Sequence, residues 1–582
     1  MPVAAAAEGD GVETASLSAG GLRPYDEIPL PLPLKDEDAA RYRHIFKLQE
    51  QSRWSEADRE IARLTNRVLV GEVLAERYLS SNAYRAKFIE LRNWLANYAD
   101  HADAPGIYKL AAKRMPRGAT RPRNPEGTTF NAAADETAVS DSVRSLSPSA
   151  RRRLARMRSA IRHDIDEGSY GAARELLASP EVQRLFDPVE YGRLDAEIAD
   201  GYEALNQGRD GLEGLPAVRS KRGPAAEEWD SGLAAWQSKK YDVAAQHFER
   251  LAMIDSIDSW TRAAGAYWAA RSNLRAGEPD KVPHWLEISA NFPYTFYGIL
   301  SRKLSGKSFD YNWDLPAFTR VDSAQINATG AGQRALALIQ IGEDARAERE
   351  LRRINSAQPE MAHALLAVSQ RTDMPSLAVQ LAKQVTDKNG RHYDAALYPV
   401  PSWQPAGGYR VDRAFVFALI RQESNFSAQA KSQRGARGLM QLMPSTARFI
   451  SSGTSYRGAS RQLSDPTLNI ALGQNYLAHL MGTDFIGDNL FWIVAAYNGG
   501  PGNLARWQRE IQPADDPLAF LESIPNRETR EFVEHVMANY WIYRDQLGQT
   551  VPELDAIAEG KWPTYKSTDG NFIPAVTKNG GN

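Results

Sequence analysis

Hydrophobic positions follow a helical period along most of the chain. Between residues 36 and 70, Tyr42, Ile45 and Phe46 fall near helical spacing, and Ile61, Leu64 and Val68 repeat the pattern. No segment shows the sustained apolar–polar alternation that is typical of a half-buried strand. The pattern therefore predicts an all-α chain.

Several segments read as pairs of short helices. The clearest pair spans residues 227–254, where a turn at Lys239 and Lys240 separates a Trp236-containing helix from one that carries Phe248 and Leu251. Similar units recur at 47–70, 343–356 and 376–386, but without a strict consensus. Small residues alternating with large ones are characteristic of tetratricopeptide-like hairpins. We expect an irregular α-solenoid, an architecture that most often serves as a binding scaffold.

Breaks in the pattern divide the chain into domains. Pro-rich, Gly-rich and polar stretches mark the boundaries. The expected division is a disordered arm at 1–34, a helical superhelix at 35–315 with a disordered excursion at about 115–147, a helical linker domain at 316–393, a compact domain at 394–550 and a tail at 551–582.

Composition narrows the function classes. The formal charge is −2 with 24% charged residues, which argues against a general nucleic-acid binder. The absence of cysteine excludes disulfides, thiolate zinc sites and iron–sulfur clusters. The nine histidines are scattered and no Asp-rich loop has calcium-binding spacing, so no metal or cofactor is expected. No apolar run approaches the roughly 18 residues of a membrane span, and we expect a soluble protein.

One carboxylate lies on an apolar helical stripe. In the segment 412–424, Val416, Leu419, Ile420 and Glu423 occupy positions i, i+3, i+4 and i+7. Burial disfavours the charged form of a carboxyl and raises its pKa, which suits a general acid near neutral pH. Periodicity alone leaves open the alternative that Glu423 turns outward at the helix end.

Two further segments carry candidate chemistry. Residues 438–444 read Gly-Leu-Met-Gln-Leu-Met-Pro, where the methionines are equally compatible with core packing. A later helix is expected to end at Gly499 and Gly500, which places Tyr497 and Asn498 at its C-terminal end. Between them, Asp465 followed by Pro466 is typical of a helix start, so we assign Asp465 a capping role and not that of a second catalytic acid.

Taken in order, these motifs resemble the soluble lytic transglycosylases of family 1. The motifs are Glu423-Ser424, Gly438 to Pro444, Ala496 to Gly500, and Ile524-Pro525 followed by Glu528-Thr529-Arg530. The resemblance is strong from about Tyr398 to Gln549 and weaker before it. It implies a lysozyme-like α domain seated on a ring or horseshoe of helices. It also implies cleavage of the β-1,4 bond between N-acetylmuramic acid and N-acetylglucosamine in peptidoglycan, leaving 1,6-anhydromuramoyl ends.

The same resemblance implies roles for individual residues. Glu423 would act first as acid and then as base, whereas ordinary glycosidases use two carboxyl groups. Positions that would bind the substrate are Ser424, Met440, Gln441, Tyr497, Asn498, Glu528 and Arg530. For Glu528 and Arg530, an ion pair at a helix end is an equal alternative. Where some relatives carry a tyrosine, this chain has Asn539 beside Tyr540, so Tyr497 is the better candidate for a hydroxyl near Glu423.

Two other functions compete with this prediction. A goose-type lysozyme-like muramidase would hydrolyse the same bond with water, and a non-catalytic envelope scaffold would only bind glycan. The expected partners are peptidoglycan glycan strands, with envelope proteins as partners of the solenoid. Residues 1–22 lack the cationic start and apolar core of a signal peptide. Either the protein is cytosolic, or this numbering begins near a processed end with an added Met. Because the resemblance implies a peptidoglycan substrate, we expect a periplasmic protein whose signal peptide is absent from this numbering.

Overall fold

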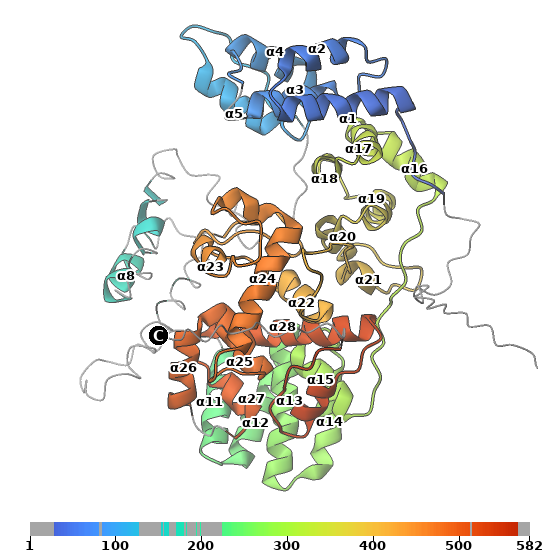
Figure 1. The fold of residues 1–582 in the computed structure, drawn as a ribbon. Coiled ribbons are helices and arrows are strands. Elements are labelled where there is room, and N and C mark those ends of the chain that lie inside the picture. The colour runs from blue at the N-terminus through green and yellow to red at the C-terminus, as the bar shows by residue number, and fades with distance from the viewer. Residues whose placement is uncertain are drawn as a thin grey trace, which may run out of the picture. The chain divides into compact units, whose positions relative to one another are not determined.

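The computed structural model describes most of the chain as helices (Figure 1). The described residues are 28–80, 84–126, 153–154, 156–161, 164, 170–179, 182, 194, 198, 224–255, 257–432, 434–511 and 515–568. Within these ranges β-structure is limited to isolated bridges, which confirms the predicted all-α class. The chain forms two compact units, one from the described parts of Met1–Asn131 with Tyr311–Pro401, the other from those of Ala132–Asp310 with Ser402–Asn582.

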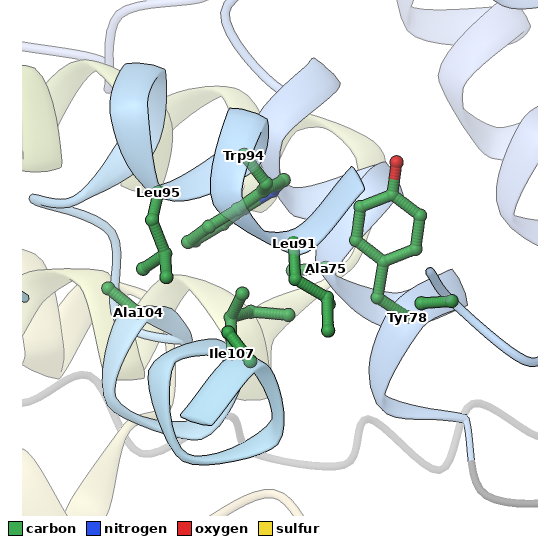
Figure 2. Close-up of a cluster of buried hydrophobic side chains, with 9 residues drawn as sticks. Ala75, Tyr78, Leu91, Trp94, Leu95, Ala104 and Ile107 are labelled. Atoms are coloured by element: carbon green, nitrogen blue, oxygen red, sulfur yellow. The ribbon is translucent and has the colours of Figure 1, made fainter. Parts of the chain in front are cut away.

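The first unit is built from two groups of helices. They are α1 (Asp36–Glu50), α2 (Trp54–Ala62), α3 (Val70–Leu79), α4 (Phe88–Tyr98) and α5 (Ala104–Arg114), then α16 (Arg320–Asn327), α17 (Gly330–Ile341), α18 (Asp344–Leu351), α19 (Pro359–Arg371), α20 (Pro375–Ala382) and α21 (Asp394–Leu397). Figure 2 shows the apolar core that joins α3, α4 and α5, in which Leu91, Trp94 and Ile107 are almost fully buried.

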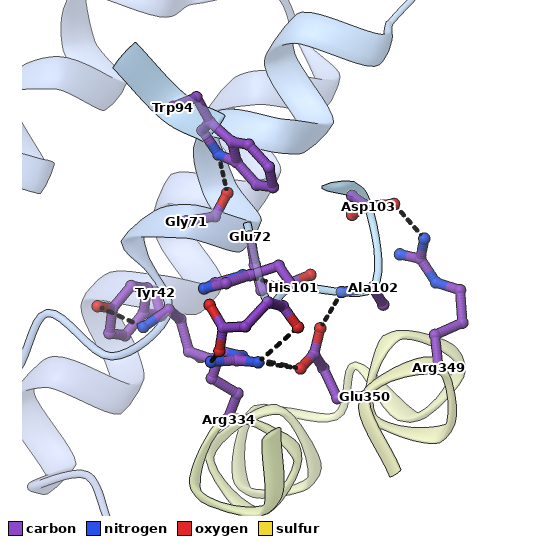
Figure 3. Close-up of polar contacts among 12 residues, drawn as sticks. Tyr42, Gly71, Glu72, Trp94, His101, Ala102, Asp103, Arg334, Arg349 and Glu350 are labelled. Carbon is purple, nitrogen blue, oxygen red and sulfur yellow. Dashed lines mark hydrogen bonds and ion pairs between the residues drawn. The ribbon is translucent and has the colours of Figure 1, made fainter. Parts of the chain in front are cut away.

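A buried polar network holds the two groups together (Figure 3). On α18, Glu350 accepts hydrogen bonds from the Ala102 backbone N–H at 2.7 Å and from Nε of Arg334 at 2.8 Å. His101 Nδ1 lies 2.8 Å from Oε1 of Glu72 on α3. Separating the two groups of helices would leave these buried polar side chains without partners, which is unfavourable. The network therefore holds residues near the start of the chain against residues more than 200 positions later.

The first unit differs from the expected division in two respects. The segments expected as the start of the superhelix and as a linker domain pack together in one unit. Residues 28–34, placed in the arm, are held by Gln340, which bonds the backbone N–H and carbonyl of Leu34 at 2.9 and 2.8 Å. The rest of the arm, residues 1–27, and positions 127–147 of the excursion lie outside the described residues.

The second unit also joins segments that are distant in sequence. Its helices are α8 (Tyr170–Leu177), α11 (Pro224–Gln237), α12 (Tyr241–Ala252), α13 (Ser259–Ala276), η1 (Pro279–Lys281), α14 (Val282–Ala290) and α15 (Phe296–Leu304), then α22 (Arg413–Ser424), α23 (Pro444–Phe449), η2 (Ser460–Ser464), α24 (Pro466–Met481), α25 (Leu490–Gly499), α26 (Pro501–Glu510), α27 (Pro517–Glu522), α28 (Arg527–Gln546) and α29 (Pro552–Ala558).

Helix α22 lies in the core of the second unit. Residues 414–420 are each 0% exposed, so this helix is buried on all sides and not along one stripe. It packs along α28, where Trp541 stacks on Phe296 of α15 with ring centroids 5.0 Å apart. The helices before residue 310 therefore contribute directly to the core of the domain that carries Glu423.

Residues 551–568, expected as part of a tail, belong to this core. Trp562 packs against Phe491, Trp492 and Phe520 with centroid distances of 5.2–6.3 Å. The Leu490 N–H also bonds the carbonyl of residue 563 at 2.9 Å. A tail boundary at residue 550 thus fails to describe positions 551–568, because apolar side chains beyond it close the domain.

A fully buried ion network fixes the start of α22. Arg544 of α28 lies 3.2 Å from the carboxylate of Asp412 and 3.1 Å from that of Glu553, with all three side chains 0% exposed. Ser567 and the Thr568 N–H donate to the same Asp412 at 2.9 Å.

Among the described residues, no helix combines the length and hydrophobicity of a membrane span.

We expect Arg544→Met to destabilise the second unit by about 3–5 kcal/mol, because two buried carboxylates lose their cation. The matched control is Arg527→Met on the same helix, whose exposed pair with Glu531 contributes under about 1 kcal/mol. Urea unfolding followed by tryptophan fluorescence measures both. Equal stability of the two variants would contradict the structural role of the buried network.

Candidate active site

Glu423 lies at the last turn of the buried helix α22, where the chain emerges from the core. Its side chain is half-buried. Burial raises the pKa of Glu423 to about 8, and the carboxylate of Glu528 at the start of α28 adds to the rise. At neutral pH the Glu423 carboxyl therefore carries a proton that it can donate.

The backbone around Glu423 is unusual. Asn425 ends α22 in the left-handed conformation with φ 44°, and Phe426 follows with φ 64°. Gln441, in the loop opposite, has φ 43°. Left-handed conformations are unfavourable for residues other than glycine, and they cluster where a site over-determines the backbone.

The Gly438–Gln441 turn is bonded to α22 and α24. The Ser424 hydroxyl contacts the carbonyls of Leu439 and Ile420 at 2.7 and 3.1 Å. Asn469 of α24 accepts from the Met440 N–H at 2.8 Å and donates to the carbonyls of Arg437 and Leu463. Ser424 therefore connects the catalytic candidate to the loop through its hydroxyl.

Glycines allow this close packing. A Cβ at Gly438 would lie 2.0 Å from the Leu463 carbonyl oxygen, and Gly438 has φ 78°. A Cβ at Gly473 of α24 would lie 2.0 Å from the sulfur of Met440. The Met440 side chain is consequently fully buried against α24, and this residue presents backbone atoms to its other neighbours.

Tyr497 of α25 approaches both Glu423 and the loop. Its hydroxyl donates to the Met440 carbonyl at 2.7 Å, and its ring lies parallel to that of Phe532 and near that of Tyr476. Burial raises the pKa of Tyr497 well above its usual value, with Glu423 contributing. The Tyr497 hydroxyl therefore stays protonated beside Glu423.

The remaining candidates fall into two groups. Asn498 accepts from the Thr529 hydroxyl at 2.7 Å, which links α25 to the start of α28. Glu528 is exposed and acts on Glu423 electrostatically. Arg530 contacts the end of α27, with Nε 3.6 Å from the Glu522 carboxylate and Nη1 donating to the carbonyls of Glu522 and Ile524. Its contacts match the helix-end ion pair.

The sequence-based assignment missed some residues and placed others correctly. The N-cap role of Asp465 is confirmed, since its carboxylate accepts from the Leu468 N–H at 3.0 Å. Asn469 was missed, although a lone amide between Leu468 and Ile470 is a signal for a buried hydrogen-bonding role. Tyr540 is fully buried, bonds Arg544 and packs against Phe415 near the start of α22.

One group of side chains in the described residues has metal-ligating geometry. Its members are Glu72, His101 and Glu350 of the first unit, with ligand atoms within 4.8 Å of one another (Figure 3). Arg334 already pairs with Glu350 at 2.7 Å and supplies the positive charge that an ion would bring. The donor set is better explained as an ion-pair network than as a metal centre.

Comparisons with known proteins place this geometry in context. Residues 402–518 match the family model of the transglycosylase SLT domain. The soluble lytic murein transglycosylases of Salmonella typhimurium and Escherichia coli are 39% identical over 145 residues and 37% identical over 156 residues. These matches cover 24% and 26% of this chain and only 22% and 24% of the relatives' own lengths.

The fold comparison extends over more of the chain. The crystal structure of the 70-kDa soluble lytic transglycosylase of Escherichia coli aligns with a TM-score of 0.60 at 19% identity, covering 91% of this chain and 100% of that one. A likeness at this identity concerns the fold alone. The motif-based resemblance is thus confirmed: the segment that carries Glu423 is similar in sequence to the SLT domain of soluble lytic transglycosylases, and the chain shares their all-α fold.

Proposed function

We propose that this chain is a peptidoglycan lytic transglycosylase that cleaves the bond between N-acetylmuramic acid and N-acetylglucosamine and leaves 1,6-anhydromuramoyl ends. The observation that carries the proposal is the placement of the Glu423 carboxyl at the end of a buried helix, where burial raises its pKa to about 8, inside the segment that matches the SLT domain. The named relatives are lytic murein transglycosylases.

Glu423 would perform both proton transfers. The acid donates its proton to the glycosidic oxygen as the bond from that oxygen to C1 breaks, while the substrate's N-acetyl oxygen stabilises C1. The resulting carboxylate then removes the proton of the C6 hydroxyl as that oxygen bonds to C1. The proton returns to Glu423, so no water is consumed and the enzyme is regenerated.

The neighbouring residues would orient the reacting groups. The Tyr497 hydroxyl bonds the Gly438–Gln441 turn and is close enough to Glu423 for that carboxyl to raise its pKa, and Glu528 acts on Glu423 from the start of α28. We propose that Gln441, Asn498 and Glu528 contact the sugars directly. Ser424 and the Met440 backbone would support them by fixing the turn.

The substrate defines where the protein acts. Peptidoglycan glycan strands are the proposed partners, and the periplasm is the proposed compartment. The helices that precede residue 310 would add binding surface for long strands or for envelope proteins. A hydrolase of the same fold would differ in using water as the nucleophile, and the end groups of the product distinguish the two reactions.

We expect Glu423→Gln to lower turnover of purified sacculi by about 10²–10⁴-fold or more, because the nearly isosteric amide cannot donate and retrieve a proton. Glu510→Gln on α26 is the matched control, since it removes an exposed carboxylate that pairs with Arg506 and is not among the candidate site residues, so turnover should stay unchanged. Circular dichroism should be unchanged in both. Near-normal turnover by Glu423→Gln would remove this residue from the mechanism.

The pH dependence follows from the raised pKa of Glu423. The acid is active while protonated, so kcat/KM should stay high below pH 8 and fall as pH rises through about 8. Removing the Glu528 charge should move this limb to lower pH, because a like charge disfavours ionisation of Glu423. A basic limb near the ordinary carboxyl pKa would contradict the assigned environment.

Mass spectrometry of digested sacculi tests the reaction class. We expect muropeptides with 1,6-anhydromuramoyl ends, which are lighter by one water than the reducing ends left by hydrolysis. Goose-type lysozyme on the same sacculi gives the hydrolytic reference. Reducing ends as the main product would replace the proposed function with muramidase activity, and no new ends at all would favour a glycan-binding scaffold.

A further inference from the structure

The short helix α27 is anchored at its start by the helices before residue 310. Its N-cap, Asp516, accepts from the Ala519 N–H at 3.1 Å. Both Asp516 oxygens lie 2.9 Å from Nη2 of Arg271 on α13. The guanidinium carbon of Arg271 lies 4.8 and 4.9 Å from the ring centroids of Trp236 and Trp268, which fixes its direction.

The end of α27 is anchored by a second residue of that region. Tyr297 of α15 is 1% exposed, and its hydroxyl donates to the carboxylate of Glu522, the last residue of α27. Glu522 is itself 4% exposed and pairs with Arg530 at 3.6 Å. Arg530 also bonds the carbonyls of Glu522 and Ile524. Glu522 is therefore held between a buried phenol and a guanidinium.

Arg530 belongs to the same helical turn as two residues that face the site. Thr529 bonds Asn498 at 2.7 Å, and the Glu528 carboxylate acts on Glu423. This turn begins only five residues after Glu522, so its position depends on how the end of α27 is held. The charged groups acting on Glu522 are Arg530 and Glu531 of α28. Burial and the Glu522 carboxyl raise the pKa of Glu534 in the next turn.

We propose that Tyr297, acting through Glu522 and Arg530, is a positioning residue that sets the first turn of α28, and with it Glu528, against Glu423. The proposal rests on the proposed function, because it assigns Glu423 the role of acid. Tyr297 itself touches no reacting atom. The proposal makes Tyr297, a residue 126 positions before Glu423, an indirect determinant of the electrostatic environment of Glu423.

The test removes one hydroxyl from the full chain. Tyr297→Phe should let the first turn of α28 move away from Glu423, so the basic limb of kcat/KM on sacculi shifts down by about 0.3–0.5 pH unit, a two- to threefold loss above the limb. The control is Tyr267→Phe, which removes the hydroxyl of a buried ring 4.9 Å from Tyr297. The charged groups that act on the Tyr267 hydroxyl are Arg271 and Asp516 at the start of α27, so this variant leaves the Glu522 contact at the end of α27 in place. The control profile should match that of the parent chain.

A double variant identifies the route. If Tyr297 acts through Glu528, the shift in Tyr297→Phe with Glu528→Gln equals the shift in Glu528→Gln alone. A larger shift in the double variant, or no shift in Tyr297→Phe, overturns the proposal. Should Tyr297→Phe fail to fold by circular dichroism, Glu522→Gln weakens the same ion pair with Arg530 and must lower the limb. An unchanged profile there also overturns it.

This test is independent of the reaction class. The limb is measured as total bonds cleaved, and both transglycosylase and hydrolase chemistry need Glu423 as the acid. Reducing ends produced by hydrolysis would therefore disprove the proposed function and leave the positioning role of Tyr297 unaffected. An unshifted limb with anhydro products would do the opposite.

Discussion

Burial of α22 on all sides is the constraint on which the site depends. Seven consecutive residues, 414–420, are fully buried. The helix ends one residue after Glu423, whose carboxyl lies where the helix reaches the surface. Because the helix is held in place, the half-buried Glu423 carboxyl stays partly desolvated, and this desolvation raises its pKa. The buried pair of Asp412 and Arg544 fixes the other end of the helix, and thereby its axial position.

The rest of the site is arranged to meet this fixed carboxyl. Ser424 and Asn469 bond the backbone of the Gly438–Gln441 turn, and Tyr497 bonds it from α25. Each contact uses a side chain to hold backbone, and buried polar groups in such a network are all needed at once. The left-handed residues 425, 426 and 441 are tolerated because these contacts over-determine the loop.

The second unit shows how a remote segment can belong to an active site. The helices before residue 310 do not simply precede the segment that matches the SLT domain, since Phe296, Tyr297 and Arg271 pack on or bond to α27 and α28. The first turn of α28 thus contacts the end of α27, which Tyr297 holds, and also contacts Asn498 of α25 through Thr529.

The sequence by itself determined the helical class, the cap at Asp465 and the resemblance that points to Glu423, because periodicity, capping and short motifs are local properties. Tertiary structure decided what depends on distant partners. The i, i+3, i+4 pattern indicated one apolar stripe, whereas α22 is covered on every side by α28 and its neighbours. Arg530 belongs to a motif of the resembling family, yet in the folded chain it pairs with Glu522. Residues 551–568 have the composition of a tail, yet Trp562 packs in the core. Such contacts join positions that no local pattern connects, so only the folded chain reveals them.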